Sequence, residues 1–161
     1  MLKYIYNTFQ NRINMEATKA GKVIALYITT TESKESIPKD ELQVDEKGIL
    51  LDKHYDKDID RSILVTSLDS YVLVKDHGIE IPQSALGENL LIDYNPYALP
   101  AGTQMQIGSA VIEISQDCTM CKHLSSIDKR VPKLLKNDRG IFVKVVKPGL
   151  IKKDDEIFVL G

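Results

Sequence analysis

The sequence predicts a mainly β domain of the α+β type, in which short strands form a β-barrel and a few short helices cover it. Three observations predict this fold. Short runs rich in β-branched and aromatic residues recur along the chain. Stretches with helical spacing are few and modest, and strands do not alternate with helices as they do in a parallel sheet. Closing such strands into a barrel also removes exposed sheet edges.

The first half contains strand-like runs separated by polar segments. A strand should begin at Lys22, and the charged stretch Thr31–Glu46 is expected to be a loop without chemistry of its own. A helix should begin after Ser67, with Gly78 as its stop and Leu68, Val72 and Leu73 as its buried face. The expected strands are Lys22–Thr30, Gly48–Leu51 and Arg61–Thr66.

The second half contains a hairpin pattern, because polar and apolar residues alternate on both sides of Gly108-Ser109. Leu124, Ile127, Val131 and Leu134 have helical spacing, which Pro132 should interrupt. The expected strands are Leu90–Ile92, Thr103–Ile107, Ala110–Ser115, Gly140–Val146 and Glu156–Leu160.

Length and charge limit the possible functions. The 161 residues favour one domain at 22–161, preceded by an N-terminal arm at 1–21 with a plausible helix over 2–14. The 21 Lys and Arg nearly balance the 23 Asp and Glu, which argues against nucleic-acid binding but allows a local anion site. No apolar run approaches the ~20 residues of a membrane span, and no secretory signal is evident, so a cytoplasmic location is expected.

Cys118 and Cys121 form a C-x-x-C pattern with three interpretations. A helix starting nearby could lower the pKa of a thiol and give a redox pair, with a reversible disulfide that gates the site. A zinc site would need two of the three histidines, His54, His77 and His123, to converge on the cysteines. The third interpretation is two half-buried thiols that pack as small apolar groups.

Several polar residues are candidates for an anion site, although each is also compatible with an ordinary surface position. His54 and Arg61 flank a polar loop, and a guanidinium can bind an anion in a bidentate manner. Asn89 follows Gly87-Glu88 and offers both a donor and an acceptor. Lys122 would stabilise a thiolate at Cys121 if the two side chains met.

The order of these motifs resembles the MOSC domain family, which is related to the C-terminal part of molybdenum-cofactor sulfurases. The similarity covers about residues 22–160 and is closest to small stand-alone bacterial members. It rests on Leu51-Asp52-Lys53-His54 followed by Arg61, Gly87-Glu88-Asn89-Leu90, the Leu99–Gly108 run, Ser115-Gln116 followed by Cys121, and Gly140 followed by Val145, Gly149 and Asp154 or Asp155. The family usually has Pro-Arg-x-Pro-Cys at the reactive position. Here Cys121 matches the cysteine, but Cys118 stands in place of the arginine, which removes a candidate phosphate contact.

The resemblance implies a β-barrel that binds the molybdenum cofactor (molybdopterin), and at the family level it also implies pyridoxal phosphate binding. Cys121 would be the catalytic thiolate, either as a molybdenum ligand or as a persulfide carrier. His54, Arg61, Asn89 and Lys122 would contact the cofactor, and Cys118 is a candidate redox partner. The implied activities are sulfur transfer and reduction of N-hydroxylated compounds, with a redox or sulfur-donor protein as partner, because the sequence contains no flavin or iron–sulfur motif.

The cysteine at position 118 in place of the family arginine also favours an alternative function. The domain could be a non-catalytic binding module for a small anionic metabolite or a partner protein. An unreactive Cys121 would favour this module over an enzyme.

Overall fold

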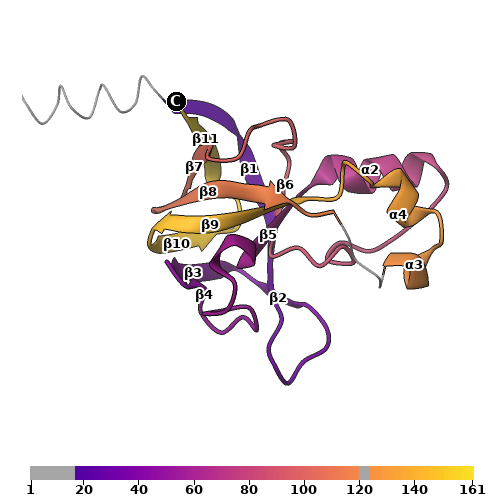
Figure 1. Cartoon of the computed structure of the whole chain (residues 1–161), viewed down its shortest axis with the longest axis horizontal. Coiled ribbons are helices and arrows are strands. Elements are labelled where there is room, and N and C mark those ends of the chain that lie inside the picture. The colour runs from indigo at the N-terminus through magenta and orange to yellow at the C-terminus, as the bar shows by residue number, and fades with distance from the viewer. Residues whose placement is uncertain (1–16, 120–123) are drawn as a thin grey trace, which may run out of the picture.

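The computed structural model describes residues 17–119 and 124–161, and within them it has a closed ring of seven strands (Figure 1). The predicted β-barrel is therefore confirmed, whereas the predicted helix over 2–14 lies outside the described residues. Around the ring the strands are β1 (Ala17–Ile28), β11 (Glu156–Leu160), β7 (Gln104–Ile107), β8 (Ala110–Asp117), β9 (Ile141–Lys147), β5 (Ile63–Ser67) and β6 (Leu90–Ile92), and β6 pairs with β1 again.

The long strand β1 closes the barrel. Its first half pairs with β11, from Ala17 opposite Leu160 to Lys22 opposite Glu156, and its second half pairs with β6. The strand thus begins at Ala17 and not at the expected Lys22. Residues 17–21 lack a run of β-branched residues, so their strand conformation comes from the backbone pairing with β11 and not from local propensity.

A second, three-stranded sheet lies beside the barrel and corrects the expected loop over Thr31–Glu46. It contains β10 (Gly149–Lys152), β3 (Glu41–Asp45) and β4 (Gly48–Ile49), while β2 (Ile37–Lys39) extends the barrel sheet at β1. Leu42 and Val44 alternate with polar residues along β3 and are buried. This short period-two pattern was hidden among the charges around it.

The helices gather on one side of the barrel (Figure 1). They are α2 (Leu68–Asp76), α3 (Leu124–Ile127) and α4 (Val131–Leu134), with a short 3₁₀ turn η1 (Ile59–Arg61) elsewhere. The Ser67 side chain caps α2 as expected by accepting from the Asp69 amide. The expected buried face was wrong, because Ser70 and Val74 are the buried residues and Val72 is 53% exposed. The helical run is interrupted as expected, but between Ile127 and Val131, and Pro132 lies in the first turn of α4, where a proline is tolerated.

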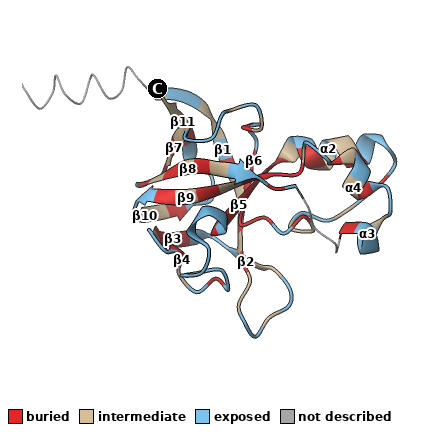
Figure 2. Ribbon diagram, in the orientation of Figure 1, coloured by how far each residue is buried: buried red, intermediate tan, exposed pale blue. Residues whose placement is uncertain are grey.

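Two apolar clusters stabilise these layers. The larger fills the barrel, where buried positions alternate along β7, β8 and β9 while β5 and β6 are buried throughout (Figure 2). The smaller lies under the helices and contains Val74, Ile79, Leu86, Leu124, Val131 and Leu135. Among the described residues, no helix is both long enough and apolar enough to cross a membrane.

The hairpin turn between β7 and β8 gives a test of the fold. Gly108 has a φ of 58°, and a Cβ there would lie 2.3 Å from the Leu150 carbonyl oxygen of β10. Gly78 has a φ of 77°, and a Cβ there would have no described atom within 4 Å apart from its chain neighbours. Gly78→Ala should therefore cost only the left-handed conformation, about 1 kcal/mol, and Gly108→Ala about 3 kcal/mol in urea unfolding. Equal losses would show that the contact between the hairpin and β10 is wrong.

Candidate functional site

A cavity of about 530 Å³ brings together four of the residues that the sequence singled out. His54, Arg61, Asn89 and Cys118 all line it, although they come from distant parts of the chain. Cys121 and Lys122 lie outside the described residues, as does His123 of the zinc hypothesis, so the roles expected for them stay predictions. Other lining residues are Thr29, Lys34, Ser36, Asp52, Lys53, Leu64, Leu86, Gly87, Arg139 and Phe142.

The buried carboxylate of Asp52 connects the segments around this cavity. One oxygen accepts from the Thr29 amide (2.9 Å) and from the Asn89 side-chain amide (3.3 Å). The other accepts from the His54 backbone amide (3.0 Å) and lies 3.2 Å from His54 Nδ1. Burial acts to raise the pKa of Asp52, but the hydrogen bonds from His54 and Thr29 outweigh it, so the pKa lies below its usual value.

The contact with Asp52 orients the His54 ring. An ionised carboxylate can only accept, so His54 Nδ1 carries the hydrogen of this bond. The second ring nitrogen, Nε2, is then the one that can accept from or, when protonated, donate to a ligand. The His54 side chain is 53% exposed, in contrast to the 1% of Asp52. The carboxylate is thus the internal anchor, and the imidazole is the group that can meet a ligand.

Asn89 holds β-strands together from inside the protein. Its side-chain oxygen accepts from the Leu64 amide (3.0 Å), and its side-chain nitrogen donates to the Tyr27 carbonyl (3.2 Å) and to Asp52. The Asn89 backbone also bonds with Tyr27 and Leu64. Its amide group is therefore committed to β1, β5 and Asp52, which identifies Asn89 as a positioning residue. Direct contact between Asn89 and a ligand stays a prediction.

Arg61 is exposed and lies at the end of η1, two residues before β5, the strand that it was expected to begin. Its guanidinium lies over the Phe142 ring, 4.9 Å from the ring centre. Asp58 caps η1 by accepting from the Asp60 amide (3.2 Å). Stacking uses the flat face of the guanidinium, while its N–H donors point outward in its plane. The arrangement presents Arg61 to the cavity as an anion-binding group.

Arg139 is a site residue that the sequence analysis missed. It is 6% exposed and donates through Nη2 to the Leu86 carbonyl (3.0 Å) and through Nη1 to the Cys118 sulfur. Its Nε is buried with no hydrogen-bond partner among the described residues. A guanidinium from just before β9 therefore contacts Cys118, the residue that stands where the family pattern has an arginine. The sequence could have indicated Arg139 only as a charged residue directly before an apolar strand. The contact of Arg139 with Cys118 depends on tertiary structure.

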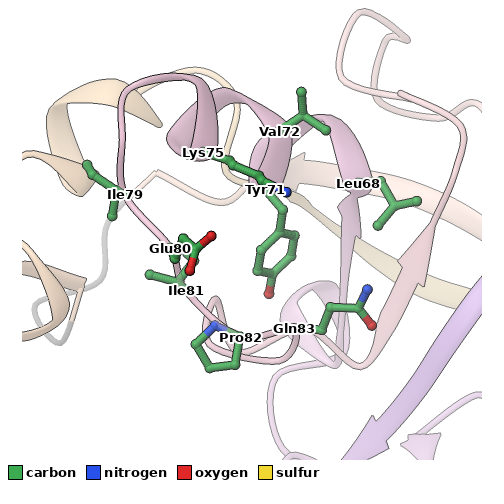
Figure 3. Close-up of a pocket in the computed structure, with 9 residues that line it drawn as sticks. All are labelled: Leu68, Tyr71, Val72, Lys75, Ile79, Glu80, Ile81, Pro82 and Gln83. Carbon is green, nitrogen blue, oxygen red and sulfur yellow. The ribbon is translucent and has the colours of Figure 1, made fainter.

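Glu88 is a second buried charge in this region. Its two oxygens lie 2.7 and 2.5 Å from the Tyr71 hydroxyl, and burial raises the pKa of Glu88 to about 7. Tyr71 also lines a separate cavity of about 570 Å³ beside α2 (Figure 3). The side chains around that groove are mainly apolar, with Lys75 and Glu80 as its charged members among the described residues. The groove lacks the convergent cations of the cavity around His54 and Arg61.

A family model for the MOSC domain matches residues 51–158, which include Asp52, His54, Arg61, Asn89, Cys118 and Arg139. The chain belongs to the MOSC domain family. Its matched region begins just before the Asp52-His54 turn and ends within the last barrel strand, so it includes most of the barrel and the cavity lining apart from Thr29, Lys34 and Ser36.

Solved structures share this MOSC fold at low sequence identity. The YUAD protein from Bacillus subtilis has a TM-score of 0.76 and 20% identity, over 89% of this chain and 97% of that one. YiiM from Escherichia coli has a TM-score of 0.65 and 20% identity, over 87% and 70% of the two chains. YiiM from Geobacillus stearothermophilus has a TM-score of 0.65 and 16% identity, over 90% and 75%. No curated protein sequence is significantly similar to the chain.

The Asp52 network gives a test of the site. Asp52→Asn puts an amide donor against the His54 backbone N–H and should lower the free energy of unfolding by about 2–4 kcal/mol near neutral pH. Asp76→Asn, at the exposed end of α2, is the control and should change it by less than about 0.5 kcal/mol.

The same variant has a defined pH dependence. Because the pKa of Asp52 is lower in the folded protein, its carboxylate stabilises the fold above the unfolded-state pKa, and this contribution is lost as the pH falls through the folded-state pKa. Urea unfolding should therefore show the difference between wild type and Asp52→Asn shrinking in acid. A difference that stays constant or grows would contradict the Asp52 network.

Proposed function

We propose that this MOSC domain binds the phosphate-bearing molybdenum cofactor in the cavity around His54 and Arg61, with Cys121 as its reactive thiolate. One observation carries the proposal. Lys34, Lys53, His54, Arg61 and Arg139 converge on the cavity, and Asp52 is the single acidic residue among its described lining. The Asp52 charge is met by internal hydrogen bonds, so the basic side chains remain to attract an anionic ligand.

The residues present fit a phosphate group. The cavity of about 530 Å³ lies within the range of roughly 300–1,000 Å³ typical of small-molecule sites. Arg61, stacked on Phe142, would bind phosphate oxygens through its in-plane donors. His54 would contribute Nε2, and Lys34 and Lys53 would add positive charge at the cavity. Arg139 also lines the cavity, but its guanidinium is engaged by the Cys118 sulfur and the Leu86 carbonyl.

The position of Cys118 supports a reactive thiolate at Cys121 close to these cations. The Cys118 amide donates to the Gly140 carbonyl (3.0 Å), which fixes the start of the loop against β9. Cys121 follows three residues later, and a fully extended chain of that length spans at most about 10–11 Å. A thiolate is a soft ligand for a transition metal and a nucleophile for sulfur. Lys122, next in sequence, would stabilise the thiolate.

The proposed reaction is sulfur transfer or reduction of an N-hydroxylated compound. The bound cofactor would supply two-electron redox chemistry at molybdenum. The chain would bind the phosphate through Arg61, fix the His54 ring through Asp52, and present Cys121 as metal ligand or persulfide carrier. A redox protein would supply electrons for reduction, and a sulfur-donor protein would supply sulfur for transfer.

Purification with the cofactor supplied tests the proposal. Wild type should carry pterin, together with molybdenum or sulfane sulfur. Cys121→Ser should keep the pterin and lose the molybdenum or the sulfane sulfur. Arg61→Ala should weaken pterin binding roughly tenfold, the effect of losing a charged hydrogen bond of about 1.4 kcal/mol, and should therefore lower the pterin occupancy. Elemental analysis, fluorescence of the oxidised pterin and cyanolysis of sulfane sulfur measure the three quantities.

Lys147→Ala is the matched control, because Lys147 is an exposed cation at the far end of β9 from Gly140. It should leave all three quantities unchanged. The proposal is wrong if wild type binds none of the three, or if Cys121→Ser retains all of them at the wild-type level. Binding of an anionic metabolite without cofactor, by a protein whose Cys121 has ordinary thiol reactivity, would instead indicate the non-catalytic module.

A further inference from the structure

Cys118 and Arg139 form a contact that the proposed cofactor chemistry does not use. The Cys118 sulfur accepts from Arg139 Nη1, and the two residues are 4% and 6% exposed. Both nevertheless line the cavity that His54 and Arg61 also line. Cys118 directly follows β8 and Arg139 lies just before β9. The contact therefore depends on the pairing of these two barrel strands.

The buried guanidinium requires a negative partner. An arginine remains protonated at any physiological pH, and a buried unpaired charge is strongly destabilising. The Leu86 carbonyl, which accepts from Nη2, carries only a partial charge. Nε has no partner among the described residues, so the guanidinium is short of acceptors. A thiolate at Cys118 would supply the missing charge at hydrogen-bond contact.

Glu88 is the main competitor for this role, because it interacts electrostatically with Arg139. The hydrogen bonds of its carboxyl group to side chains, however, go to Tyr71, and burial raises the pKa of Glu88 to about 7. Glu88 is therefore partly protonated at neutral pH. The Cys118 sulfur is the group in direct contact with the guanidinium and is the better placed of the two to balance it.

We propose that Cys118 is a thiolate paired with Arg139, and that the pair is a modification site for small anionic electrophiles that enter the cavity. Arg61, His54 and the cavity lysines would attract the anion, Asp52 is the acidic member of the described lining, and Cys118 would attack the electrophile. The proposal does not depend on cofactor binding or on the reactivity of Cys121. It assigns to Cys118 a reaction of its own.

Iodoacetate is a suitable probe because it is small and anionic. The Cys118 sulfur attacks the methylene carbon, a sulfur–carbon bond forms, the carbon–iodine bond breaks, and iodide leaves with the electron pair. No proton is transferred, because the sulfur is already ionised. Iodoacetamide reacts in the same way but carries no charge, so the ratio of the two rates measures the attraction of the cavity for an anion.

The experiment uses the full chain with Cys121→Ser, so that Cys118 is the remaining cysteine. Alkylation is followed by mass spectrometry from pH 6 to pH 8. An ordinary thiol, with a pKa near 8.5, should react roughly 75-fold faster at pH 8 than at pH 6. Cys118 should change by less than about threefold, and its iodoacetate-to-iodoacetamide ratio should exceed that of a cysteine peptide roughly tenfold.

Variants at positions 139 and 88 test the cause. Arg139→Met should give the steep rise of the alkylation rate with pH that an ordinary thiol shows. Arg139→Lys should give an intermediate rise, because lysine keeps the charge but cannot donate from two nitrogens at once. Glu88→Gln keeps a partner for Tyr71 but removes the competing charge, and because Cys118 is already a thiolate, its rate should be unchanged at pH 6 and at pH 8. Circular dichroism confirms that each variant is folded.

If Arg139→Met does not fold, the pH profile and the rate ratio of the Cys121→Ser chain, which keeps Arg139, still test the proposal. A steep rise of the Cys118 rate with pH in the Cys121→Ser chain, or no alkylation of Cys118 in the folded protein, overturns the proposal. An iodoacetate-to-iodoacetamide ratio equal to that of the peptide also overturns it. These outcomes are separate from cofactor loading, which is measured on molybdenum and pterin and not on Cys118.

Discussion

The buried carboxylate of Asp52 is the interaction on which the cavity depends. Through Thr29 it holds the segment after β1, through His54 it holds its own turn, and through Asn89 it holds the entry to β6. Asn89 in turn bonds with Leu64 of β5 and Tyr27 of β1. A carboxylate without these donors would be too costly to bury, so the donors and the carboxylate require one another.

The charges around the cavity are arranged so that acidic groups are satisfied inside the protein and basic groups face a ligand. The Asp52 charge is taken up by hydrogen bonds, and Glu88 is bound to Tyr71. Arg61 is held by stacking on Phe142, which leaves its donors available. Arg139 supplies a cation behind Cys118, where the sequence lacks the arginine usual in MOSC domains. The net charge of −2 does not predict this local basic site, because it sums over the whole chain.

The barrel could be predicted from sequence because its strands carry their own signals. The β7–β8 hairpin and the cap of α2 depend on local residues, and both were predicted correctly. The three-stranded sheet could not be predicted, because β3 alternates over only a few residues within a charged stretch. The family motifs indicated His54, Arg61 and Asn89. The inward commitment of Asn89 and the approach of Arg139 to Cys118 arise from tertiary packing, which spacing along one chain does not encode.

The central claim is that the cavity held by Asp52 is the binding site for a phosphate-bearing ligand. Titration of the ¹⁵N-labelled protein with inorganic pyrophosphate, followed by backbone amide shifts, tests it most directly. The account predicts saturable shifts at Thr29, His54 and Arg61, with the α2 groove around Val72 unaffected. Shifts confined to the groove, or no saturable shift at the cavity residues into the millimolar range, would contradict it.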